Sequence, residues 1–276
     1  MFMETKEKWQ LYFADSDNRF REKAKPISTD GRNPFENDYG RLISSAPIRR
    51  LQDKTQVFPL GESGFTRTRL THSLEVSYIG SSIGQSIEKI LIDRGEIEKE
   101  HKGYLSSLLR VAGLVHDLGN PPFGHFGEEA IKSFFKEYFE ENKGKGLTTE
   151  LSDIEKADFT NFDGNVQTFR ILSKLYYFGD EYGYNLSYPT LASIIKYPVD
   201  SLTGNKKHDE EISKHKFGYF VSESDRYAQI NNKLQLEHKR FPIVYLLEAA
   251  DDIAYSAADI EDGVKEGIIT IQDVSK

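Results

Sequence analysis

Residues 104–118, YLSSLLRVAGLVHDL, are the stretch from which the fold can be predicted. Apolar side chains fall on nearly every side of a helix with 3.6 residues per turn, which is typical of a helix buried at the centre of a molecule. Gly119 supplies a helix stop, and the prolines at 121 and 122 cannot continue the helix. The stretch therefore predicts a central helix that ends at an adjacent His116 and Asp117.

Helical periodicity continues on both sides of this stretch, and alternating strand patterns are scarce. An apolar stripe predicts a helix over 70–93. Further helices are expected over 128–141, 163–177, 187–196, 222–236 and 242–263. The polar segments 142–153 and 200–216 are expected to be exposed loops. We therefore expect an all-α fold in one domain over residues 1–276.

The composition excludes several classes of protein. The 276 residues carry 36 Lys and Arg against 44 Asp and Glu, a net charge of −8, which does not indicate a nucleic-acid binder. Zero Cys excludes disulfides, thiolate metal sites and a cysteine nucleophile. No stretch approaches the ~20 apolar residues of a membrane helix, and the first 15 residues lack a signal-peptide core. We expect a cytoplasmic protein.

The last residues have the pattern of a helix beginning. Thr270 followed by Asp273 resembles a capped first turn, yet the sequence stops at Lys276. The expectation is a polypeptide truncated at its C-terminus.

His116 and Asp117 are the first candidates for chemistry. A charged Asp beside a His at the end of an apolar helix costs several kcal/mol unless it is paired or metal-bound. A histidine near a helix C-terminus with a solvated Asp is the ordinary alternative. His72, beside the apolar stripe of 70–93, would by itself be read as a hydrogen-bonded core histidine.

Two further groups change this interpretation. Asp251, Tyr255 and Asp259 are spaced by four residues and share one helix face, although a solvated acidic face has the same spacing. His125 precedes Glu128 by three residues, so this carboxylate can hold one ring N–H and leave the other nitrogen for proton transfer. Glu128 at a helix N-terminus is the ordinary alternative.

His72, His116-Asp117 and Asp251, in this order, resemble the HD superfamily of metal-dependent phosphohydrolases. The chain is most similar to the deoxyguanosinetriphosphate triphosphohydrolase branch, and Asn120 matches that branch where other members have His. Six ordered blocks carry the resemblance: IRRLQDKTQVF (48–58), TRTRLTHSLEV (66–76), HDLGNPPFGHFGE (116–128), FDGNVQTFRIL (162–172), LASIIKYP (191–198) and LEAADDIAYSAADIED (247–262). The resemblance implies an HD-type helical fold with a metal site between its central helices, in a family whose chains are generally longer.

The resemblance also implies that His72, His116, Asp117 and Asp251 hold one divalent metal ion. Two imidazoles and two carboxylates suit Mn²⁺, Mg²⁺, Fe²⁺, Co²⁺ or Ni²⁺. Zn²⁺ is less expected, because a catalytic zinc prefers a tetrahedral site with fewer protein ligands.

The implied reaction is hydrolysis of a deoxynucleoside triphosphate, dGTP above others, to the deoxynucleoside and inorganic triphosphate, in a homo-oligomer. His125 and Glu128 would then be catalytic. The implied substrate-binding residues are Gln56, Arg69, Lys196, Lys216, Tyr255 and Asp259. The alternatives are another HD phosphohydrolase, such as a nucleotidase or phosphodiesterase, and a non-catalytic dNTP-binding module.

Overall fold

The computed structural model describes residues 5–14, 18–21, 30–57, 66–176, 180–204 and 215–274. Within these residues the chain forms helices and no β-strand, which confirms the all-α prediction. The longer helices are α1 (Thr5–Phe13), α2 (Pro34–Ile43), α4 (Arg69–Asp93), α5 (Tyr104–Val115), α6 (Gly124–Glu141), α8 (Asp153–Thr160), α11 (Ser224–Lys233) and α12 (Ile243–Lys265). The shorter ones are α3 (Ala46–Arg50), α7 (Leu147–Glu150), α9 (Gly164–Arg170), α10 (Tyr188–Ala192) and α13 (Ile271–Val274).

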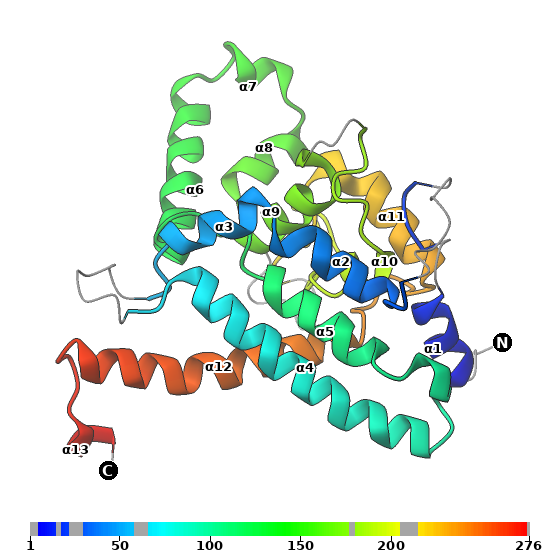
Figure 1. Cartoon of the computed structure of the whole chain (residues 1–276). Coiled ribbons are helices and arrows are strands. Elements are labelled where there is room, and N and C mark those ends of the chain that lie inside the picture. Colours follow the sequence, from blue (N-terminus) through cyan, green and yellow to red (C-terminus); the bar gives the residue numbers. More distant parts are fainter. Residues whose placement is uncertain are drawn as a thin grey trace.

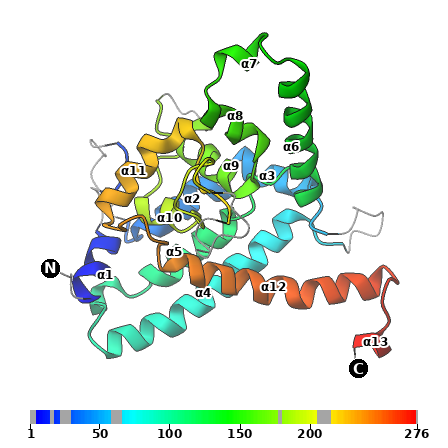
Figure 2. The ribbon, with the colours of Figure 1, turned by 180° about the vertical axis from the view of Figure 1, so that it is seen from behind.

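Helix α5 is the centre of the fold, as its sequence predicts. Nine of its residues are buried, Val111 and Val115 among them. Helices α4 and α5 run side by side across the molecule (Figure 1), and α12 packs against α4 on the side that Figure 2 shows. The same three helices carry His72, His116 and Asp251.

Arg67 fixes the direction in which α12 crosses α4. Its guanidinium donates to Asp262 at 2.6 Å, to Glu261 at 2.5 Å and to Glu75 at 3.1 Å. The start of α4 therefore lies against the end of α12. Because His72 then meets Asp251, eleven residues before Asp262, the two helices run antiparallel.

The central helix ends earlier than its pattern predicts. Helix α5 stops at Val115, and residues 116–120 form turns in which Leu118 N–H donates to Val115 O. The loop is pressed onto α9: Gly119 N–H donates to Thr168 Oγ1 at 2.8 Å, and a Cβ at 119 would lie 2.2 Å from Thr168 N. This packing against a distant helix fixes the turn that follows α5 and carries His116 and Asp117.

Other boundaries also differ from the sequence predictions. Helix α6 begins at Gly124 instead of 128, and the predicted helix 163–177 is α9 followed by a π-helical turn, η3 (Ile171–Leu175). Of the predicted helix 187–196, only α10 is helical. The predicted helix 222–236 is shorter in the structure, where a 3₁₀ turn, η5 (Val221–Glu223), precedes α11. The predicted loop 142–153 contains α7, and α2, α3 and α8 were not predicted.

Part of the second predicted loop, residues 205–214, lies outside the described residues, as does Phe58. The capped turn at the end of the sequence is present: Thr270 Oγ1 and N–H both donate to Asp273 Oδ2, and α13 follows. Among the helices that the structure describes, none combines the length and the apolar character needed to span a bilayer.

Candidate metal centre

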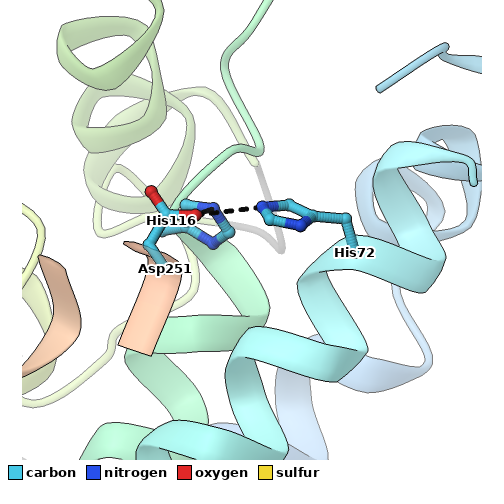
Figure 3. A group of neighbouring side chains, drawn as sticks. All are labelled: His72, His116 and Asp251. Atoms are coloured by element: carbon cyan, nitrogen blue, oxygen red, sulfur yellow. Dashed lines mark hydrogen bonds and ion pairs between the residues drawn. The ribbon is translucent and has the colours of Figure 1, made fainter. Parts of the chain in front are cut away.

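His72, His116 and Asp251 converge from three helices (Figure 3). His72 Nε2 lies 3.0 Å from Asp251 Oδ1, and His116 Nε2 lies 3.5 Å from the same oxygen. The Thr68–Thr71 capping box starts α4 and sets His72 in its first turn. Buried Ala250 and Ala254 let α12 approach closely. One ligand atom from each of the three residues lies within 4.8 Å of the others.

A hydrogen bond to the backbone of α5 fixes the orientation of the His116 ring. Its Nδ1 lies 2.8 Å from Gly113 O, and because a carbonyl oxygen can only accept, Nδ1 carries the proton. In the neutral ring Nε2 then holds the lone pair that a metal ion needs. This Nε2 is buried without a hydrogen-bond partner and faces the carboxylates of Asp251 and Asp117.

Asp117 lies beside the trio and is held by other groups. Its Oδ1 is 3.6 Å from His116 Nε2 and accepts from Asn120 Nδ2 at 2.7 Å. Its Oδ2 is paired with the guanidinium of Arg69, which is 5% exposed. Arg69 therefore supplies one buried positive charge against the two carboxylates of Asp117 and Asp251. Burial opposes a charge on His116, but the same two carboxylates outweigh it and raise the pKa of this histidine.

Electrostatics at this cluster favour a cation. Burial raises the pKa of Asp251, but the hydrogen bond with His72 and the charge interactions with His116 and His72 outweigh it and lower the pKa far below the ordinary value. Burial likewise opposes ionisation of Asp117, and the charges of His116 and Arg69 outweigh it and lower its pKa. Both carboxylates are therefore ionised.

The spacing of the ligand atoms also fits a metal ion. Ligands about 2.1 Å from a six-coordinate ion lie about 3 Å apart, close to the 3.0 and 3.5 Å found here. The unpartnered Nε2 of His116 is the observation that a bound cation would explain. The donor set of imidazoles and carboxylates suits a divalent metal.

The second predicted pair, His125 and Glu128, forms in the first turn of α6. His125 Nδ1 lies 2.8 Å from Glu128 Oε2, and Gly164 N–H donates to Glu128 Oε1 at 2.7 Å. Glu128 is 3% exposed, whereas the His125 side chain is 86% exposed. A buried carboxylate thus orients an imidazole whose other nitrogen, Nε2, faces solvent.

The turn before α6 depends on two residues with positive φ. Phe123 has φ +65° and Gly124 has φ +54°. A side chain at Gly124 is disfavoured for two reasons. The positive φ strains any residue with a Cβ, and this Cβ would lie 2.6 Å from Arg69 Nη2. The close approach of Gly124 to Arg69 joins the metal centre to the helix that carries His125.

The remaining predicted residues lie on several elements and differ in exposure. Lys216 donates to Asp163 at 2.9 Å, and Lys196 is half-buried after α10. Tyr255 is 42% exposed on α12 and Asp259 is half-buried one turn further on. Burial is the main reason that the pKa of Asp259 is raised, and the charge of His72 opposes it.

Gln56 and an unpredicted neighbour, Lys54, lie where residues 54–57 meet the start of α4. The amide Oε1 of Gln56 is buried without a partner, beside the isolated bridge between Thr55 and Thr68. Lys54 Nζ donates to Asn120 O at 2.7 Å, so it holds the loop whose amide binds Asp117. Lys54 lies in the sequence block 48–58. Its place in that block is the one sequence feature that could have indicated a role for Lys54.

Comparison with protein families identifies the class of this fold and site. Residues 69–165 match the HD domain family. This range includes His72, His116 and Asp117. The chain therefore contains an HD domain over these residues.

Curated relatives are similar over most of this chain. A protein of Listeria monocytogenes named deoxyguanosinetriphosphate triphosphohydrolase-like protein is 45% identical over 274 residues, 98% of this chain and 58% of the relative. A protein of Pseudomonas aeruginosa PAO1 with the same name is 42% identical over 91% of this chain. One of Salmonella paratyphi A named deoxyguanosinetriphosphate triphosphohydrolase is 36% identical over 87% of this chain. The chain spans a little over half the length of these relatives.

Proposed function

We propose that this chain is the metal-binding part of a hydrolase that converts a deoxynucleoside triphosphate, with dGTP preferred, into the deoxynucleoside and inorganic triphosphate. The observation that carries the proposal is the convergence of His72, His116 and Asp251 beside Asp117. The names of the curated relatives support the substrate class.

His72, His116, Asp117 and Asp251 would hold one divalent ion, with Mn²⁺, Mg²⁺, Fe²⁺, Co²⁺ and Ni²⁺ as the candidates. When bound, such an ion neutralises charge on a phosphate and lowers the pKa of a bound water. Asn120 and Arg69 hold Asp117, and Gly113 holds His116, so the chain positions these ligands before a metal arrives.

Cationic side chains near the centre would bind the phosphates. Arg69 is buried at the centre, Lys216 stands beside the first turn of α9, and Lys196 follows α10. Tyr255 and Asp259 would contact the deoxyribose, Asp259 by accepting from the 3′-hydroxyl and Tyr255 by crowding the 2′ carbon. Gln56, with its unpartnered amide oxygen, would complete the sugar pocket.

In the proposed reaction a water oxygen bonds to the α-phosphorus and the bond from this phosphorus to the 5′-oxygen breaks. The water loses a proton and the 5′-oxygen gains one. Because Glu128 holds a proton on Nδ1, Nε2 of the neutral His125 ring can accept the proton of the water, and Nε2 of the doubly protonated ring can donate one to the 5′-oxygen. Hydrolysis in H₂¹⁸O should place the label in triphosphate and leave none in the nucleoside.

Comparison of leaving groups separates the two roles of His125. A p-nitrophenyl triphosphate releases an anion that needs no proton. If His125 protonates the 5′-oxygen, His125→Ala should lose much less activity on this compound than on dGTP. An equal loss on both would assign His125 to the water instead.

Product analysis tests the function itself. The whole protein should release triphosphate from dGTP with Mn²⁺, and cleave GTP much more slowly because Tyr255 crowds the ribose 2′-hydroxyl. Orthophosphate or a linear monophosphate as product would identify another HD phosphohydrolase. Binding of dNTPs without any product would identify a non-catalytic module.

A further inference from the structure

Lys216 is already paired with a carboxylate in this structure. Its Nζ donates to Asp163 Oδ2 at 2.9 Å, and Asp163 is 4% exposed. The other oxygen of Asp163 accepts from the backbone N–H of Asn165 at 2.8 Å, which caps α9. Asp163 thus does two separable things: it begins a helix and it holds an ammonium group.

Glu128 belongs to the same charged cluster. Gly164, the residue after Asp163, donates its N–H to Glu128 Oε1 at 2.7 Å. Burial opposes the charge on Lys216, but Asp163 and Glu128 outweigh it and raise the pKa of Lys216. The ammonium of Lys216 therefore has two carboxylates within electrostatic range, and one of them orients His125.

Local packing keeps Lys216 at this place. Phe217 is 2% exposed and packs with Val166 of α9 and with Phe220 in a small apolar cluster. The backbone at 216 is therefore anchored to the helix that Asp163 caps. The Lys216 side chain is 39% exposed, so packing does not enclose its ammonium, and the contact that holds it is the ion pair with Asp163.

We propose that Asp163 is a positioning residue that holds the Lys216 ammonium away from Glu128, so that Glu128 remains the acceptor for His125 Nδ1–H. An ammonium bonded to Glu128 would compete for the lone pairs of its carboxylate and offset its charge, which would weaken the bond that orients His125. The kinetic consequence rests on the function proposed above, whereas the orientation of His125 does not.

Substitution can separate the cap from the charge. Asparagine caps helices as well as aspartate does, so Asp163→Asn keeps the bond to Asn165 N–H and removes the ion pair. Acid–base groups contribute about 10²–10⁴-fold to turnover, and we expect Asp163→Asn to lower kcat by about tenfold or more. Lys216→Met lowers activity by itself if Lys216 binds a phosphate, so the double variant is compared with Lys216→Met at saturating dGTP. Against that variant Asp163→Asn should cause no further loss of kcat, because no ammonium is left to bind Glu128.

Asp200→Asn is the matched control. Asp200 accepts from Leu202 N–H and Thr203 N–H in a comparable turn, and its substitution should not change kcat. If Asp163→Asn lowers kcat equally with and without the Lys216→Met substitution, Asp163 acts only through the helix cap and the proposal is wrong. Asp163→Ser, which also caps without charge, provides a second variant.

The tautomer of His125 gives a readout that needs no turnover. In Mg²⁺-loaded protein, the ¹⁵N shifts of the neutral ring should show Nδ1–H in the wild type, a shift towards Nε2–H in Asp163→Asn, and Nδ1–H again in Asp163→Asn/Lys216→Met. An unchanged tautomer in Asp163→Asn would overturn the proposal. If no dNTP yields triphosphate, the proposed function fails, and the tautomer still decides this inference.

Discussion

The ring of His116 donates its Nδ1–H to the carbonyl oxygen of Gly113, 2.8 Å away and one helical turn earlier. This bond leaves Nε2 as the lone-pair nitrogen and directs it at Asp251. The backbone of α5 thereby selects the tautomer that a metal ligand requires. Oδ1 of Asp251, from α12, lies 3.0 Å from His72 Nε2 and 3.5 Å from His116 Nε2.

Removal of the shared carboxylate should abolish metal binding. Asp251→Asn keeps the shape of the side chain but replaces an anionic oxygen by an amide, and even substitutions around a metal ligand cost about 10–100-fold in affinity. We expect at least this loss, measured by elemental analysis after dialysis and by titration with Mn²⁺. Asp252→Asn, at the exposed neighbouring position, is the control and should retain the metal. Normal metal content in Asp251→Asn would refute the assignment.

Glu128→Gln should separate turnover from metal binding. The amide oxygen must face Gly164 N–H, so the NH₂ group faces His125 and cannot accept its Nδ1–H. Because acid–base groups contribute about 10²–10⁴-fold, we expect a kcat loss in that range with unchanged metal content. The control is Glu129→Gln, at the exposed adjacent position. Wild-type kcat in Glu128→Gln would exclude the pair from the chemistry.

The sequence was sufficient for the parts of the fold that depend on periodicity. The apolar residues on nearly every side of the helix pattern at 104–118 predicted the central helix. The apolar stripe at 70–93 predicted α4 to within one residue of its start. The i, i+3 spacing of His125 and Glu128 predicted a contact that the structure contains. These features depend on neighbours within one or two turns, which a sequence displays directly.

Features that depend on distant contacts could not be read in the same way. The turn after α5 is held by Gly119, which packs on Thr168, a residue 49 positions away. The pairing of Lys216 with Asp163 and of Lys54 with Asn120 joins segments with no common periodicity. The resemblance assigned Lys216 to a phosphate, and only the fold shows which carboxylate it meets first.

Arg67 should contribute to stability through its three carboxylates. Arg67→Ala would leave the carboxylate of Asp262, which is 5% exposed, without its cation. A buried group left unpaired costs about 1–3 kcal/mol or more, so we expect urea unfolding to show a loss of this size. Lys265→Ala, which removes another partner of Glu261 from an exposed i, i+4 pair, should cost only about 0.3–0.5 kcal/mol. Equal effects of the two substitutions would contradict this role of Arg67.

Asp158 should make stability fall as pH rises. Burial raises its pKa to about 6, although Ser201 and Val221 N–H donate to its carboxylate. Between the unfolded pKa of about 3.9 and this value, the folded state binds a proton that the unfolded state has lost. The free energy of unfolding therefore decreases across this window, and at 1.36 kcal/mol per pKa unit the decrease is about 3 kcal/mol.

Asp158→Asn removes this dependence without removing the hydrogen bonds. Its amide oxygen can accept from Val221 N–H while its NH₂ donates to Ser201 Oγ, which also approaches Ile154 O. Urea unfolding at pH 4 and pH 7 should show the variant gaining about 2 kcal/mol on the wild type between the two values, because the unfolded carboxyl has already lost part of its proton at pH 4. Asp153→Asn, at an exposed position in the first turn of the same helix, should show no such gain. A difference between variant and wild type that is the same at both pH values would mean that Asp158 is already charged at pH 4.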